Sequence, residues 1–274
     1  MTSLERAAPR AAWAEPSAPV RFAEDLWTVA AAELRKLAHD PSELVTRAVQ
    51  PILWLLVFGQ VLARARAIPT GSLGYIDFLS PGILAQSALF SAIFYGIAVI
   101  WERDLGVLHK YLVSPASRAA LVSGKALAGG IRSLVQAAVI YAVAALIGVH
   151  LQLGLPQFAG VVLVVVLGSA GFATFSLVIA CIVRTRERFM GIGQVLTMPL
   201  FFASSAVYPI DVMPDWLQAV ARVNPLTYQV DALRALMVEG GTASFPIALD
   251  IAVLAATVVI LVAIAARLYP RLAQ

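Results

Sequence analysis

The chain alternates between long apolar stretches and short segments that carry nearly all of its charges. Six stretches of about 20 residues are almost free of charged side chains, and a helix of this length crosses the hydrocarbon core of a bilayer. The third and fourth stretches share one charge-free tract, which we divide between Gly148 and Pro156 because glycine and proline favour a turn. The pattern predicts an all-α integral membrane protein with six transmembrane helices. They cover roughly residues 44–63, 79–100, 126–148, 158–183, 189–209 and 246–267.

The N-terminal region precedes the first of these spans. Within residues 22–39 apolar side chains recur at helical spacing and charged ones occupy the other positions, which predicts an amphipathic helix lying in the membrane interface. A soluble helix packed on another subunit would show the same pattern. Residues 1–20, rich in alanine and proline, predict a disordered tail, and residues 21–274 predict one transmembrane domain.

The segment between the fifth and sixth spans predicts two short helices. The first ends at Val223, the pair Asn224 and Pro225 breaks the chain, and a second helix covers Leu226–Val238 before the glycines that follow it. Each helix is too short to cross a bilayer. Their apolar content favours a re-entrant pair that dips into the outer leaflet, where protein or water must cover the irregular backbone.

Composition supports a membrane protein and suggests its orientation. Of the 274 residues 60% are hydrophobic and 13% are charged, about half the charged share of a soluble domain. With the N-terminus placed inside, sixteen of the 20 Lys and Arg residues lie on the inner side, so both termini are predicted to be cytoplasmic in a cell membrane. The net charge of +4 then reflects sidedness and does not indicate a nucleic-acid partner.

No catalytic, metal-binding or cofactor-binding pattern is present. The three histidines are far apart, and no H-E-x-x-H or G-x-S-x-G sequence occurs. The run Ser123-Gly124-Lys125-Ala126 resembles part of a P-loop but lacks its first glycine and its final Ser or Thr. Ionisable residues near mid-membrane, which an ion-coupled transporter needs, are also missing. We therefore expect that the chain is not itself an enzyme.

The segment after the second span carries the most specific pattern. Leu105, Leu108 and Leu112 recur at helical spacing among charged residues, and Ser114-Pro115 ends the pattern. This predicts a short amphipathic helix that projects into the cytoplasm and buries its apolar stripe in a groove of a partner protein. A helix lying on lipid would satisfy the same stripe.

Two motifs together resemble a known family. Residues Trp101–Arg118 are similar to the coupling-helix region of ABC-2 type transporter permeases. The segment Pro209-Ile-Asp-Val-Met-Pro214, followed by Asn224–Tyr228 and Asp231–Arg234, resembles the hallmark between that family's fifth and sixth spans. The likeness extends from about residue 20 to the end. It is greatest to permeases of the daunorubicin-resistance type, with nodulation and polysaccharide exporters as relatives.

The resemblance implies a transmembrane permease of an ATP-binding cassette exporter. Two permease subunits, identical or different, would pair with two copies of a separate ATPase subunit that binds ATP and Mg. The residues 22–39 would form the family's elbow helix, and the outer helix pair would line or cap the exit. The residues expected to couple to the ATPase are Glu102, Arg103, Leu105, Gly106, Leu108 and Leu112, with Pro115 and Arg118 fixing the loop. Those of the outer motif are Pro209, Pro214, Asn224, Pro225, Tyr228, Asp231 and Arg234.

The substrate is less defined by the sequence. We expect an amphiphilic substrate, a drug, a lipid or a glycolipid or polysaccharide, moved out of the cytoplasm or the inner leaflet. The aromatic side chains of the spans suit a lipid-like or aromatic amphiphile, and ordinary packing or contact with lipid would also explain them. An ion-coupled secondary transporter and a membrane-embedded enzyme are the alternative functions. Inverted repeats or paired polar catalysts at matched depth would favour them, and neither is visible.

Overall fold

The computed structural model describes residues 17–39, 42–66, 68–106, 116–183 and 185–270. These ranges are helical and contain no strand, and one isolated antiparallel bridge pairs Leu151 with Val238. The long helices are α1 (Ala18–His39), α4 (Tyr75–Asp104), α6 (Arg118–Leu146), α7 (Leu155–Ile182), α8 (Arg186–Phe202) and α11 (Ile247–Leu268). The shorter ones are α2 (Ser42–Leu53), the π-helix η1 (Trp54–Gly59), α3 (Gln60–Ala65), the 3₁₀ turn η2 (Ile210–Val212), α9 (Asp215–Val223) and α10 (Pro225–Met237).

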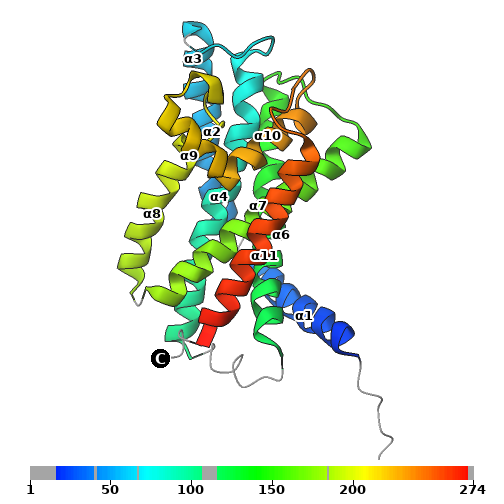
Figure 1. Ribbon diagram of the computed structural model, residues 1–274, viewed down its shortest axis with the longest axis vertical. Helices are drawn as coiled ribbons and strands as arrows, with labels where there is room; N and C mark the ends of the chain where they lie inside the picture. Colours follow the sequence, from blue (N-terminus) through cyan, green and yellow to red (C-terminus); the bar gives the residue numbers. More distant parts are fainter. Residues whose placement is uncertain (1–16, 40–41, 67, 107–115, 184, 271–274) are drawn as a thin grey trace, which may run out of the picture.

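The long helices form an elongated bundle with two distinct ends (Figure 1). We call the α1 end the one at which α4 ends, α6 begins and α1 projects sideways from the bundle. We call the α9 end the opposite one, where α3, α9 and α10 lie. Successive long helices run in opposite directions between these ends, as short connections between packed helices require.

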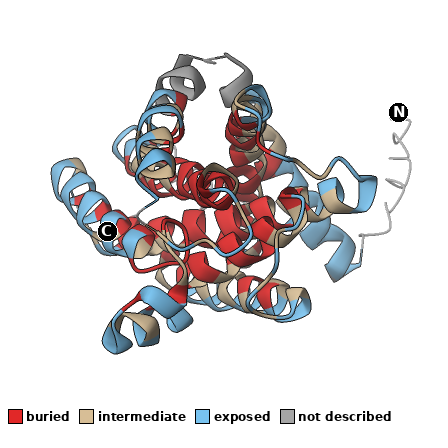
Figure 2. Cartoon of the chain, turned by 90° about the horizontal axis from the view of Figure 1, so that it is seen from above, coloured by how far each residue is buried: buried red, intermediate tan, exposed pale blue. Residues whose placement is uncertain are grey.

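The core lies along the middle of the bundle, where buried residues gather in the view from above (Figure 2). Helix α4 is at its centre, and it packs against α6, α7, α8 and α10. Its side chains are buried on all sides, as Leu79, Ile83 and Leu84 illustrate with 0% exposure. In contrast, α11 leaves Val259 and Ile260 exposed by 67% and 58%. Such an apolar outer face is stable where hydrocarbon or another subunit covers it.

Five helical stretches in the described residues are long and apolar enough to cross a membrane. They are Ala48–Ala65, Tyr75–Asp104, Arg118–Leu146, Leu155–Ile182 and Ile247–Leu268. They coincide with five of the six predicted spans. The remaining helix, α8, has 17 residues, about 26 Å at 1.5 Å per residue, and the chain forms turns from Ala203 onward. The sixth crossing therefore stays a prediction.

The structure corrects three predicted boundaries. The disordered tail was expected to reach residue 20, whereas α1 already begins at Ala18. Glu102 and Arg103, expected on a separate helix after the second span, form the last turn of α4. Lys125, expected just before the third span of residues 126–148, lies about two turns inside α6, which begins at Arg118. The end of α4 and the start of α6 extend beyond the apolar pattern, and the charges there, Glu102 and Lys125, pair with each other in a buried contact.

The turns predicted from glycine and proline are confirmed. The charge-free tract divides where α6 ends at Leu146, and Gly148 adopts a φ of 85° that suits glycine. The two short helices between α8 and α11 are α9 and α10, separated at Asn224. Whether they re-enter the membrane stays a prediction.

A close backbone contact at Gly82 gives a test of the packing. A Cβ atom added there would lie 2.2 Å from the carbonyl oxygen of Ala206, so α4 and the turn after α8 could not keep their separation. We expect Gly82→Ala to lower the free energy of unfolding by about 1–3 kcal/mol, measured as a lower Tm in detergent. Gly191→Ala is the matched control, because an added Cβ there meets nothing within 4 Å. Equal Tm values for the two variants would contradict this packing.

Candidate functional site

Of the predicted coupling residues, those that the structure describes lie at the α1 end, and the others fall in residues 107–115. Leu105 follows the last turn of α4 and is 71% exposed. Gly106 has a φ of 71°, which breaks the helix at this point. Arg118 opens α6 with its side chain exposed. Leu108, Leu112 and Pro115 lie outside the described residues, so the amphipathic helix expected there stays a prediction.

A buried ion-pair cluster lies next to this connection. The ammonium of Lys125 on α6 is 3.0 Å from Glu33 Oε1 on α1 and 2.6 Å from Glu102 Oε2 on α4. All three residues are less than 9% exposed. Arg132 lies close by, its guanidinium carbon 5.5 Å from the ring centre of Tyr95, the same ring that Lys125 approaches at 5.9 Å. The buried triad thus contains two acids and one base, and the half-buried Arg132 brings a second base to the same ring.

Glycine allows α1 to reach this cluster. A Cβ atom at Gly124 would lie 2.7 Å from the carbonyl oxygen of Leu26 and 2.8 Å from Cβ of Val29. The absence of a side chain therefore brings the backbones of α1 and α6 into direct contact. The sequence Ser123-Gly124-Lys125, which resembles part of a phosphate-binding loop, instead serves helix packing and ion pairing.

A second, more exposed set of charges joins α8 to the end of α4. Asp104 accepts hydrogen bonds from Arg103 at 2.9 Å and from Arg186 at 2.7 Å. The guanidinium carbon of Arg186 also lies 3.5 Å from the ring centre of Trp101. Because Arg186 opens α8, the final turn of α4 is tied to α1, α6 and α8 just before Leu105 and Gly106.

At the α9 end, Asn224 of the predicted outer motif connects the end of α8 to the start of α10 by hydrogen bonds. The side-chain amide of Asn224 donates to the carbonyl oxygens of Leu200 at 2.7 Å and Ala203 at 2.8 Å. Its Oδ1 accepts from the N–H of Leu226. Asn224 therefore caps α10 and satisfies the last carbonyl groups of α8, which have no partner within their own helix. Pro225 is the first residue of α10, where its missing N–H costs nothing.

The other motif residues hold the connection to α11. Asp231 accepts hydrogen bonds from the backbone N–H groups of Ser244 at 3.0 Å and Phe245 at 2.9 Å. Tyr228 packs its ring 5.2 Å from that of Phe245 and donates its hydroxyl to the carbonyl of Arg222. The two other prolines of the motif lie directly before helical segments, Pro209 before η2 and Pro214 before α9.

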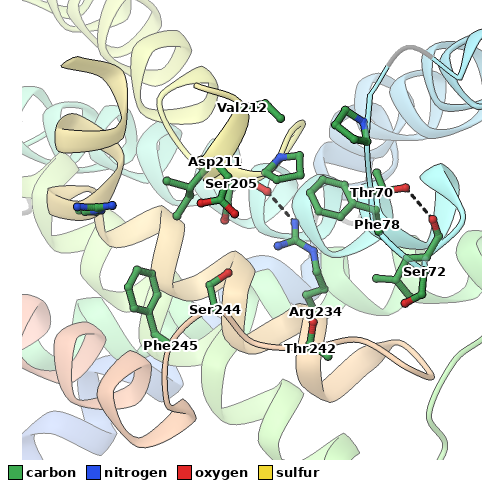
Figure 3. Close-up of a pocket in the computed structure, with 16 residues that line it drawn as sticks. Thr70, Ser72, Phe78, Ser205, Asp211, Val212, Arg234, Thr242, Ser244 and Phe245 are labelled. Carbon is green, nitrogen blue, oxygen red and sulfur yellow. Dashed lines mark hydrogen bonds between the residues drawn. The ribbon is translucent and has the colours of Figure 1, made fainter. Parts of the chain in front are cut away.

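Arg234 lies at a pocket at the α9 end (Figure 3). Its Nη2 donates to the carbonyl oxygen of Ser205 at 2.7 Å, and its guanidinium carbon is 3.8 Å from the ring centre of Phe78. Burial lowers the pKa of Arg234 to about 10, against the opposing effect of Asp231, so the side chain stays charged at neutral pH. We call the cavity the α9-end pocket. It has a volume of about 940 Å³ and is lined by the 69–73 connection, Phe78, the 205–212 segment, Arg222, Arg234 and residues 242–245.

Two residues of the α1-end cluster were missed from sequence. Glu33 belongs to the helix predicted to lie in the membrane interface, and Lys125 precedes the predicted third span, yet both are buried. A signal existed, because Lys125 is the one charge between Arg118 and Arg132, and a lone cation in an apolar helix needs a partner. The sequence does not show which acidic residue pairs with Lys125, because that depends on how α1 packs against α6.

The two ends thus differ: ion pairs join helices at the α1 end, and a pocket lies at the α9 end. The described residues contain no group of three or more metal-ligating side chains. A helical bundle with five candidate spans defines a multi-pass membrane protein. A family model described as ABC-2 type transporter matches residues 24–238. The chain belongs to this family, the transmembrane permeases of ABC transporters, which work with an ABC ATPase subunit.

Named relatives agree with this assignment. The chain is 31% identical over 220 residues to ycf38 of Cyanophora paradoxa, a transport permease by its name, with 78% of this chain and 74% of the relative covered. It is 26% identical over 232 residues to the daunorubicin resistance ABC transporter permease protein DrrB1 of Streptomyces coeruleorubidus, covering 84% and 81%. Nodulation protein J of Rhizobium leguminosarum bv. trifolii is 26% identical over 198 residues, covering 72% and 74%.

The buried cluster predicts a large effect of one substitution. Lys125→Met removes the buried cation that the carboxylates of Glu33 and Glu102 share, so we expect the free energy of unfolding to fall by about 3–5 kcal/mol. Thermal unfolding in detergent measures it. Arg188→Met is the control, because Arg188 is exposed at the same end, and we expect it to change stability by less than about 0.5 kcal/mol.

A combined variant separates the ion pairs from packing. Adding Glu33→Gln and Glu102→Gln to Lys125→Met removes every charge of the triad, and most of the lost Tm should return. If Lys125→Met and Arg188→Met unfold at the same temperature, the cluster does not hold α1 in place.

Proposed function

We propose that the chain is the channel-forming subunit of an ATP-driven exporter, and that a separate ATPase acts on it at the α1 end. The observation that carries this proposal is the attachment of α4 to three other helices next to the 105–117 connection. Lys125 pairs with Glu33 and Glu102, and Arg186 pairs with Asp104. A displacement of the connection by a partner would therefore move α1, α6 and α8 together with α4.

The proposed complex has two permease subunits, identical or different, and two ATPase subunits that carry ATP and Mg. Its α1 end faces the cytoplasm, so both termini are cytoplasmic, and α1 is the elbow helix lying along the inner surface of the plasma membrane. Trp27, exposed by 59%, would then reach the headgroups. The exposed apolar faces of α8 and α11 suit lipid or the second permease.

The proposed substrate is an amphiphile such as a drug, a lipid or a glycolipid. The names of the relatives, which refer to drug resistance and nodulation, support this class. An ion-coupled transporter fits less well. The buried acids Glu33 and Glu102 share Lys125 at the α1 end, and Asp250 lies in the first turns of α11 at the α9 end. These acids therefore lie toward the two ends of the bundle.

Docking of the ATPase can be tested at the leucine stripe. We expect the double variant Leu105→Asp and Leu112→Asp to abolish copurification of the ATPase, because charges in a stripe that fills an apolar groove would be buried unpaired. Leu153→Asp is the control, since Leu153 is 82% exposed at the opposite end. The measurement is ATPase recovered with the tagged chain, identified by mass spectrometry. Undiminished recovery with the double variant would rule out docking through this stripe.

Sidedness is tested independently of docking. A membrane-impermeant maleimide should label Leu153→Cys in intact cells and Leu105→Cys only after the membrane is opened. The native Cys181 is buried and provides a low background, which the parent chain measures. Labelling of Leu105→Cys from outside intact cells would invert the proposed orientation.

A further inference from the structure

Arg234 is a buried cation whose charge no acid pairs directly. The residue is 4% exposed. Asp231, the acid that influences it, directs its two carboxylate oxygens to the N–H groups of Ser244 and Phe245. Among the described residues no ion pair includes Arg234. A buried charge without a counter-ion is unfavourable, so an anion that reaches this guanidinium would be stabilised.

The hydrogen-bonding groups around the guanidinium are only partly used. Nη2 donates to the carbonyl of Ser205, while Nε of Arg234 and the hydroxyl of Ser205 are both buried without a hydrogen-bond partner. The ring of Phe78 covers one face of the guanidinium and fixes its plane. A planar fork of N–H donors held in one orientation matches the oxygens of a phosphate or carboxylate.

The α9-end pocket gives such an anion room and a path. Its volume of about 940 Å³ is at the upper end of the range for small-molecule sites. Two of its charged lining residues, Arg222 and Arg234, are basic and one, Asp211, is acidic, so its charge is positive. Arg234 lies at the wall formed with Ser205, as Figure 3 shows.

The remaining walls favour a ligand that also has an apolar part. Leu73, Phe78, Ile210, Val212 and Phe245 contribute apolar surface to the same cavity. Gly241 shapes one wall, because a Cβ atom there would lie 2.1 Å from the carbonyl oxygen of Arg234 and push residues 242–245 away. The pocket therefore combines one fixed cationic fork with apolar sides.

We propose that the α9-end pocket is a binding subsite for an oxyanion, a phosphate or a carboxylate, with Arg234 as its cationic ligand and Ser205 as a second donor. The acidic headgroup of an amphiphile and a free anion share this chemistry. Naming the exported amphiphile as the source rests on the proposed function, whereas binding to the pocket does not.

The test measures the Tm of the purified full-length chain in a neutral detergent, without the ATPase. The probes are dihexanoyl phosphatidic acid, dihexanoyl phosphatidylcholine and inorganic phosphate, each titrated at constant ionic strength. We expect phosphatidic acid to raise the Tm in a saturable manner and phosphatidylcholine to have no such effect. Arg234→Gln should weaken the apparent affinity about tenfold or more. Stabilisation by inorganic phosphate at equal concentration would identify a free anion as the source.

Two further variants keep the test decisive if Arg234→Gln does not fold. Val212→Trp adds bulk at the exposed rim, where Val212 is 49% exposed, and should abolish the anion-dependent shift while the ligand-free Tm is retained. Ser205→Ala should weaken binding and leave the ring contact of Arg234 with Phe78 in place. An unchanged shift in Val212→Trp, an equal shift with phosphatidylcholine, or no shift with any anion would overturn the proposal. Because no ATPase is present, none of these results bears on whether the chain is an exporter subunit.

Discussion

A buried ammonium group between two carboxylates determines the architecture of the α1 end. Removing Lys125, Glu33 and Glu102 from water is costly, and their mutual contacts offset that cost only in one geometry. This geometry requires α1, α4 and α6 to meet at one point, which Gly124 permits by letting two backbones touch. The position of the N-terminal helix, and hence of everything attached to α4 at this end, follows from that requirement.

At the α9 end the chain turns repeatedly between short helices. Each helix end leaves backbone groups without partners, and the polar motif residues supply them. Asn224 serves the end of α8 and the start of α10, and Asp231 serves the connection to α11. Residues of the family motif thus act first as backbone partners. Arg234 also donates to a backbone carbonyl, that of Ser205, but its Nε is buried without a hydrogen-bond partner.

The two ends of this permease are built in different ways. Charged contacts at the α1 end join four helices into one unit that a partner could displace. The α9 end presents a pocket formed by connections and short helices, which can change shape with smaller rearrangements than a packed core allows. Helix α4 runs from one to the other, since it begins near the pocket at Tyr75 and ends at Asp104 in the charged cluster.

The sequence alone determined the class of protein, five of the helical spans and the short helices α9 and α10, because hydrophobic runs and the Asn-Pro and Gly-Gly breaks are local signals. The coupling and outer motifs also pointed to the correct family. Only the tertiary structure decided that Lys125 pairs with Glu33, 92 residues away, and that Arg234 faces a cavity beside Ser205. Such contacts depend on which helix faces which, and packing geometry sets this through glycines such as Gly82 and Gly124. Periodicity assigns a residue to a helix face, but the packing of all the helices decides which other helix contacts that face.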